Sequence, residues 1–95
     1  MKLEWLPQAL NDFDEIIAYI AEDNPLAAIE QGDEIESQVA GLLDNRHKGR
    51  PGRVKGTREL VIVRTPYIAA YRIKKEAIQI LRLFHGARLW PERFW

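Results

Sequence analysis

The sequence RELVIVRTPYIAAYRIKKEAIQILRLF (residues 58–84) divides into three runs rich in Val, Ile, Leu and Tyr. Polar and apolar residues alternate within the runs, a pattern typical of β-strands. The runs predict strands over residues 58–64, 67–73 and 77–84. Because only two or three residues link consecutive runs, we expect neighbouring strands to be antiparallel.

The chain before these strands is predicted to be helical. Apolar residues recur every three or four positions over residues 7–22, which is the pattern of an amphipathic helix. Asn24 and Pro25 suit the start of a second helix, since Asn caps helix N-termini and Pro is tolerated at the first helical position. Ala28 and Gly32 lie on the apolar stripe of this second helix, so the two helices can approach each other closely.

These elements predict an α+β fold with the order β-α-α-β-β-β. Residues 2–5 alternate weakly and supply the first strand. The helical hairpin is expected to pack on one face of a small antiparallel sheet. A chain of 95 residues suits one compact domain, so we expect a single domain over residues 1–95.

Composition narrows the class of protein. No apolar run approaches the roughly 18 residues of a membrane span, and the first residues lack the basic-then-apolar layout of a signal peptide. We therefore expect a cytoplasmic protein with no membrane partner. The chain contains no cysteine, which excludes disulfides and thiolate metal sites. We expect neither a metal nor a cofactor.

A net charge of zero conceals a strong polarity along the chain. Residues 1–44 contain eleven acidic residues and one basic residue, a charge of −10, whereas residues 45–95 contain thirteen basic and three acidic residues, a charge of +10. A basic face of this kind suits nucleic acid, an acidic protein segment or the chain's own acidic half. Glycines and a proline predict a loop over residues 45–56. The loop holds one histidine and five basic residues: His47, Arg46, Lys48, Arg50, Arg53 and Lys55.

Basic and aromatic residues interrupt the apolar strands and form the candidate target-binding set. Such residues can make a concave surface for phosphates and stacked bases. Alternatively, Arg72 and Arg82 pair with Glu59 or Glu76 across the strands, and the tyrosines are half-buried packing. The candidate residues for binding the target or nucleic acid are Arg58, Arg64, Tyr67, Tyr71, Arg72, Arg82 and Arg88, and His85 lies beside them.

His85 ends the last predicted strand and has two interpretations. It is a candidate general acid or base. The alternative is a histidine that caps the strand through a backbone hydrogen bond. Beyond it, Trp90, Phe94 and Trp95 form an apolar tail, which either folds back on the helices or docks a partner.

Three segments together resemble the RelE/ParE superfamily of toxins of type II toxin–antitoxin systems. They are GTRELVI (residues 56–62), TPYIAAYRI (65–73) and ILRLFHGARLWP (80–91). The opening pattern from Trp5 to Ala21 is similar to the first helix of that superfamily, so the resemblance covers nearly the whole chain. It implies the fold derived above and a protein that inhibits bacterial growth.

The superfamily contains two activities, and the residues distinguish them. RelE-like members cleave mRNA on the ribosome with strand lysines, arginines and a C-terminal tyrosine. In this chain the corresponding positions hold Glu59, Val61, Ile68 and Phe94, and only Arg88 matches a basic residue. ParE-like members poison DNA gyrase and carry the Pro-Tyr…Tyr-Arg pattern present in this chain.

The resemblance therefore favours a ParE-like, non-enzymatic toxin that acts on DNA gyrase. The alternative is a RelE-like endoribonuclease with the ribosome and mRNA as partners. In that case His85, Arg82 and Arg58 are the candidate catalytic residues.

The resemblance also implies a cognate antitoxin, whose flexible segment folds on the toxin. An acidic or amphipathic segment would match the +10 half of the chain, and Trp90, Phe94 and Trp95 are the candidate antitoxin contacts. Operator DNA is expected to be contacted only through the antitoxin.

Overall fold

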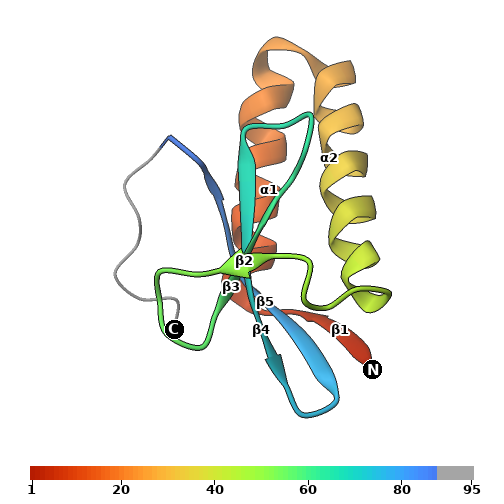
Figure 1. The fold of residues 1–95 in the computed structure, drawn as a ribbon. Coiled ribbons are helices and arrows are strands. Elements are labelled where there is room, and N and C mark those ends of the chain that lie inside the picture. The colour runs from red at the N-terminus through yellow and green to blue at the C-terminus, as the bar shows by residue number, and fades with distance from the viewer. Residues whose placement is uncertain (88–95) are drawn as a thin grey trace.

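The computed structural model describes residues 1–87 (Figure 1). The predicted site residues Arg88, Trp90, Phe94 and Trp95 lie outside the described residues. The elements in chain order are β1 (Lys2–Trp5), α1 (Pro7–Asp23), α2 (Pro25–Ala40), a 3-10 turn η1 (Gly41–Leu43), β2 (Arg50–Pro51), β3 (Arg58–Val61), β4 (Tyr67–Lys74) and β5 (Ala77–His85).

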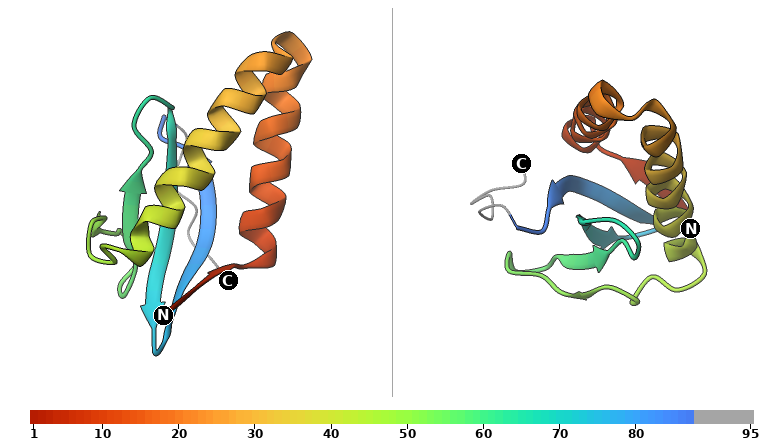
Figure 2. Two further views of the ribbon diagram at one scale, coloured as in Figure 1. Left: turned by 90° about the vertical axis from the view of Figure 1, so that its right-hand side faces the viewer. Right: turned by 90° about the horizontal axis from the view of Figure 1, so that it is seen from above.

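The two helices lie side by side and cover one face of a twisted sheet (Figure 2). The predicted cap is confirmed, because the Asn24 side chain accepts a hydrogen bond from the backbone N–H of Ala27. Close approach of the helices is also confirmed. Gly32 is buried, and a Cβ added there would lie 3.1 Å from Cδ1 of Ile17 on the neighbouring helix. In the described part of the chain, no helix is long and apolar enough to cross a membrane.

The five strands form one sheet in the order β1-β5-β4-β3-β2. The α+β class is confirmed, but the sheet is mixed rather than purely antiparallel, because β1 pairs with β5 in parallel. Parallel strands need a long crossover connection, and here the helical hairpin and the other strands separate them in the chain. The predicted loop over residues 45–56 also contains β2, which adds a short antiparallel edge to β3. Its proline is tolerated at such an edge.

Strand faces differ from simple alternation because β5 carries an irregularity. Ala70 pairs with Arg82 whereas Tyr71 pairs with Ile80, so Leu81 is an extra residue on β5. The shift reverses the alternation beyond this point. Ile80 packs in the core beneath the helices, but Phe84 contacts the separate cluster of Ala70 and Leu81. Simple alternation along residues 77–84 would place Phe84 on the same face as Ile80, and the extra residue separates them.

The strand β3 ends three residues earlier than predicted, and a tight turn replaces its end. The backbone N–H groups of Thr65 and Ile62 donate to the carbonyls of Ile62 and Tyr67, respectively. Arg64, with φ of 68°, adopts the left-handed conformation that reverses the chain. The run of Val and Ile continues into the turn, so the sequence pattern alone overestimates the length of the strand.

Candidate functional site

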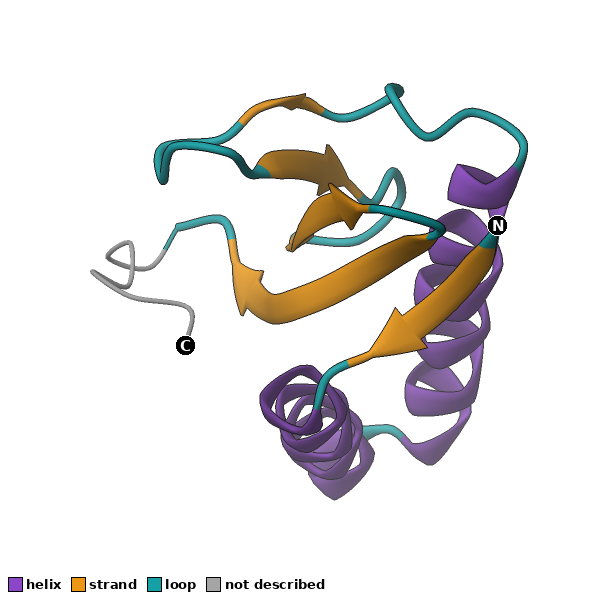
Figure 3. Cartoon of the chain, turned by 90° about the horizontal axis from the view of Figure 1, so that it is seen from below, coloured by secondary structure: helices purple, strands orange, loops and turns teal. Residues whose placement is uncertain are grey.

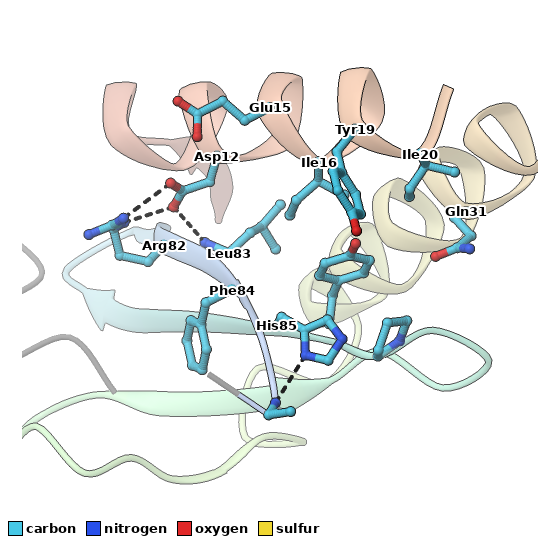
Figure 4. Close-up of a pocket in the computed structure, with 13 residues that line it drawn as sticks. Asp12, Glu15, Ile16, Tyr19, Ile20, Gln31, Arg82, Leu83, Phe84 and His85 are labelled. Atoms are coloured by element: carbon cyan, nitrogen blue, oxygen red, sulfur yellow. Dashed lines mark hydrogen bonds and ion pairs between the residues drawn. The ribbon is translucent and has the colours of Figure 1, made fainter. Parts of the chain in front are cut away.

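A groove of about 930 Å³ runs between α1 and the C-terminal end of β5 (Figure 4). Ile16 and Ile20 of α1 and Leu83 of β5 give it apolar walls. The groove also brings together three of the predicted site residues, Tyr67, Arg82 and His85.

Arg82 is held at this groove by Asp12 of α1. Its Nε lies 2.7 Å from Oδ2 of Asp12, and the same oxygen accepts the backbone N–H of Leu83 at 3.0 Å. Hydrogen bonding to Asp12 raises the pKa of Arg82 above its ordinary value. The sequence interpretation that paired Arg82 with Glu59 or Glu76 is wrong. Its carboxylate partner comes from a helix 70 residues away in the chain.

His85 makes the backbone hydrogen bond that its strand-end position suggested. Its Nδ1 accepts the N–H of Ala87 at 3.0 Å, so a neutral ring carries its proton on Nε2. The ring also makes an edge contact with Tyr67, with centroids 5.6 Å apart. A general-base role would need the lone pair on Nε2 and the proton on Nδ1, and this tautomer would give up the hydrogen bond from Ala87.

The groove contains a polar atom that sequence reasoning did not single out. Oε1 of Gln31 is buried and has no hydrogen-bond partner in the described part of the chain. A buried acceptor without a donor is unfavourable. Gln31 lines the groove beside Tyr19 and Ile20, and Asp12 and Glu15 of α1 line it as well, so its apolar walls lie beside several polar side chains (Figure 4). No sequence motif marks this glutamine.

Arg58 and Tyr71 lie away from the groove, at the base of the loop before β2. The Tyr71 side chain is fully buried, and its hydroxyl donates to the carbonyl of Arg46. The Arg58 guanidinium donates to the carbonyls of Gly49 and His47. Both residues thus hold loop backbone in place rather than facing a shared concave surface.

Arg64 and Arg72 occupy two further positions. Arg64 pairs with Glu34 of α2, with Nη2 and Oε1 2.9 Å apart. This contact, together with a hydrogen bond from Gln38, lowers the pKa of Glu34 to about 2. Arg72 donates to the side chain of Gln79 on β5 at 2.7 Å. The structure therefore gathers Tyr67, Arg82 and His85 and separates Arg58, Arg64, Tyr71 and Arg72 from them. Among the described residues, no group of His, Asp and Glu side chains is arranged to hold a metal ion.

Comparison with known proteins gives matches over nearly the whole chain. Residues 3–90 match the family model described as the ParE toxin of the type II toxin–antitoxin system parDE. The protein called "Putative toxin Y4kP" of Sinorhizobium fredii is 42% identical over 91 residues, which cover 96% of this chain and 94% of that protein. Toxin RelE2 of Caulobacter vibrioides is 33% identical, with 90% of this chain and 94% of that protein covered.

The structure is similar to a solved chain of the chromosomal ParDE TA system from P. aeruginosa. The TM-score is 0.83 at 35% sequence identity, and the match covers 90% of this chain and 95% of that chain. The expected two-helix arrangement on a small sheet is therefore also the fold of a solved relative.

Proposed function

This chain belongs to the ParE toxin family of type II toxin–antitoxin systems, and from this premise we propose that it inhibits bacterial growth by poisoning DNA gyrase and that a cognate antitoxin neutralises it. The observation that carries the proposal is its similarity, over 90% of the chain, to a solved protein of a ParDE system. Gyrase acts on the bacterial chromosome, so the proposal places the toxin in the cytoplasm.

The state of the sheet arginines supports a non-enzymatic toxin. A nuclease needs cations that are available to phosphate and groups that transfer protons. Arg82 is paired with Asp12, and Arg58 is bound to backbone carbonyls. Either residue would have to leave its present partners to bind a scissile phosphate.

The antitoxin is proposed to bind through an amphipathic segment that orders on the toxin. The groove between α1 and β5 supports this, because its apolar walls lie beside polar side chains such as Glu15, Tyr19 and Gln31. An amphipathic segment would complement both features. Trp90, Phe94 and Trp95 remain proposed antitoxin contacts, and operator DNA is proposed to be reached through the antitoxin.

Supercoiling assays test the gyrase proposal. Purified toxin added to gyrase and relaxed plasmid should inhibit supercoiling or accumulate cleaved DNA, and prior mixing with antitoxin should abolish the effect. A His85→Ala variant should inhibit as the wild type does, since the proposal gives His85 no chemistry. Unimpaired supercoiling at a large molar excess of toxin would refute the proposal.

A second candidate function is ribosome-dependent cleavage of mRNA. It is favoured by the 33% identity to a protein named Toxin RelE2 and by the grouping of His85, Arg82 and Tyr67 at one groove. Arg58 of β3 would have to leave the loop carbonyls that it binds in order to join them. Mapping of mRNA ends after induction tests this reading. It predicts new codon-linked cuts that disappear in the His85→Ala variant, and their absence in the wild type would exclude it.

A further inference from the structure

The loop between η1 and β2 and its continuation to β3 carry a set of basic side chains that the proposed function does not use. Arg46, Lys48 and Lys55 are exposed, and within the described residues none of the three has an ion-pair partner. His47 and Arg53 are also exposed. We name residues 46–55 the basic loop. Figure 3 shows it at the edge of the sheet opposite α1.

The backbone of the basic loop is held by side chains from the sheet. The Tyr71 hydroxyl donates to the carbonyl of Arg46 at 2.8 Å and accepts the N–H of Gly49 at 2.9 Å. Arg58 donates to the carbonyl of Gly49, also at 2.9 Å. The buried carboxylate of Glu59 accepts the N–H of Arg53 at 3.1 Å. Interior side chains therefore satisfy loop backbone. Among the basic side chains, Arg50 pairs with Glu59, whereas Arg46, Lys48 and Lys55 are exposed.

Close packing at Gly49 fixes the same segment. A Cβ added there would lie 2.7 Å from the Tyr71 hydroxyl oxygen and 2.8 Å from the carbonyl oxygen of Glu59. No side chain larger than hydrogen fits without displacement of the sheet. The loop is thus preorganised, which lowers the conformational entropy lost when its basic side chains bind a partner.

From these observations we propose that the basic loop is a sequence-independent binding surface for the phosphate backbone of duplex DNA, a contact separate from the operator recognition proposed for the antitoxin. Large exposed apolar side chains are absent from described residues 44–56, although such side chains anchor protein–protein interfaces. Phosphate recognition needs cations and backbone N–H groups instead, and it does not depend on base sequence.

The charge distribution orients the molecule for this contact. The acidic helix α1 lies on the far side of the sheet from the basic loop (Figure 3). A polyanion therefore attracts the loop side and repels the α1 side, so a chain with zero net charge can still approach DNA in one orientation.

Binding of a fluorescein-labelled 20-base-pair duplex, followed by fluorescence anisotropy, tests the proposal with the purified full chain and no gyrase. The variant Lys48→Gln/Lys55→Gln removes two loop charges. The matched control, Lys74→Gln/Lys75→Gln, removes two exposed charges at the β4–β5 turn. We expect the loop variant to bind about tenfold more weakly at low salt and the control within about twofold of wild type. The slope of log K against log salt should fall by about two in the loop variant.

Equal loss of affinity in both variants, or no loss in either, would overturn the proposal. A competition experiment gives a second contrary outcome. If a polyglutamate peptide displaced the duplex at a lower charge concentration than unlabelled DNA does, the loop would be a protein-binding site and the proposal would be overturned. Thermal melting of both variants confirms that they are folded. Since the assay contains no gyrase, its result is independent of the gyrase proposal.

Discussion

Basic residues are used in opposite ways by the strands and by the basic loop. In the strands and in the turn after β3, the side chain of Arg82 is bound by Asp12, that of Arg64 by Glu34 and that of Arg58 by backbone carbonyls. In the basic loop, the backbone is bound by the sheet, and side chains such as Lys48 and Lys55 extend into solvent. The same residue types thus hold the fold together in one region and remain available in the other.

This difference shows why basic composition alone does not locate a binding surface. The acidic helices neutralise only the strand arginines that lie within reach of their carboxylates. Among the described residues of the chain's +10 half, some cations stabilise tertiary contacts, whereas others, such as Lys48 and Lys55, are exposed and have no ion-pair partner. Four substitutions test this division, beginning with the largest expected effect.

Asp12→Ala should destabilise the protein most. It removes the partner of Arg82 and leaves the backbone N–H of Leu83 without an acceptor. Loss of a buried pair costs about 3–5 kcal/mol, and partial exposure of Arg82 reduces this to about 2–3 kcal/mol. Urea denaturation measures the change. Asp12→Asn can still accept the N–H of Leu83, so it should lose about half as much free energy of unfolding as Asp12→Ala. Equal losses in the two variants would show that only the charge of Asp12 matters.

Tyr71→Phe should lower the free energy of unfolding by about 1–2 kcal/mol, because it strips two hydrogen bonds from the basic loop. Amide hydrogen exchange at Gly49 should accelerate as its N–H loses the hydroxyl acceptor. The exposed Tyr19 offers a control, and Tyr19→Phe should change stability by less than about 0.5 kcal/mol. Unchanged exchange at Gly49 in the Tyr71 variant would show that the hydroxyl does not order the loop.

Gln38→Ala should have a smaller effect, about 0.5–1 kcal/mol. The Gln38 amide donates to the carbonyl of Val63 and accepts its N–H, so it satisfies the backbone just beyond β3 as a neighbouring strand would. Hydrogen exchange should accelerate at the Val63 amide and hardly at the Ile62 amide, which is bound to Tyr67. Equal acceleration at both would mean that the whole turn opens. The exposed Gln8 provides a matched Gln→Ala control.

Glu34→Gln should have the smallest effect, and that effect should depend on pH. Folding lowers the pKa of Glu34 from 4.5 to about 2, chiefly through its hydrogen bond with Arg64. A carboxyl whose pKa is lowered in the folded state stabilises that state above its unfolded pKa. The stabilisation is lost as the pH falls from about 4.5 through about 2.

The Tm difference between wild type and Glu34→Gln measures this contribution. The wild type should have the higher Tm near pH 6, and the difference in Tm should vanish near pH 2. The difference should also be smaller in 0.5 M salt, because the ion pair is exposed and salt screens it. A carboxyl titration of Glu34 centred at 4.5 by NMR would contradict the expected pairing with Arg64.

Local patterns were sufficient for the two helices, for β1, β3, β4 and β5, and for their order, but not for β2, which lies in the predicted loop. Three such patterns each span a few residues and can therefore be identified in the sequence. They are the 3.6-residue period of α1, the Asn24–Pro25 boundary and the alternation of β4. The small residue Gly32 also predicted close helix packing. Local patterns could not show the extra residue at Leu81, because a bulge depends on the pairing register of two strands.

The amino-acid sequence by itself determined the α+β class, the helical hairpin, the toxin family resemblance and the division into acidic and basic halves. Tertiary structure alone decided what each charge does. Asp12 and Arg82 are 70 residues apart and meet only when α1 packs beside β5. Tyr71 is an alternating strand residue in sequence, yet its buried hydroxyl anchors the basic loop. Such partners are set by the packing of distant elements, because a side chain's charge or hydrogen-bonding group has no preferred partner until the fold brings one within about 3 Å.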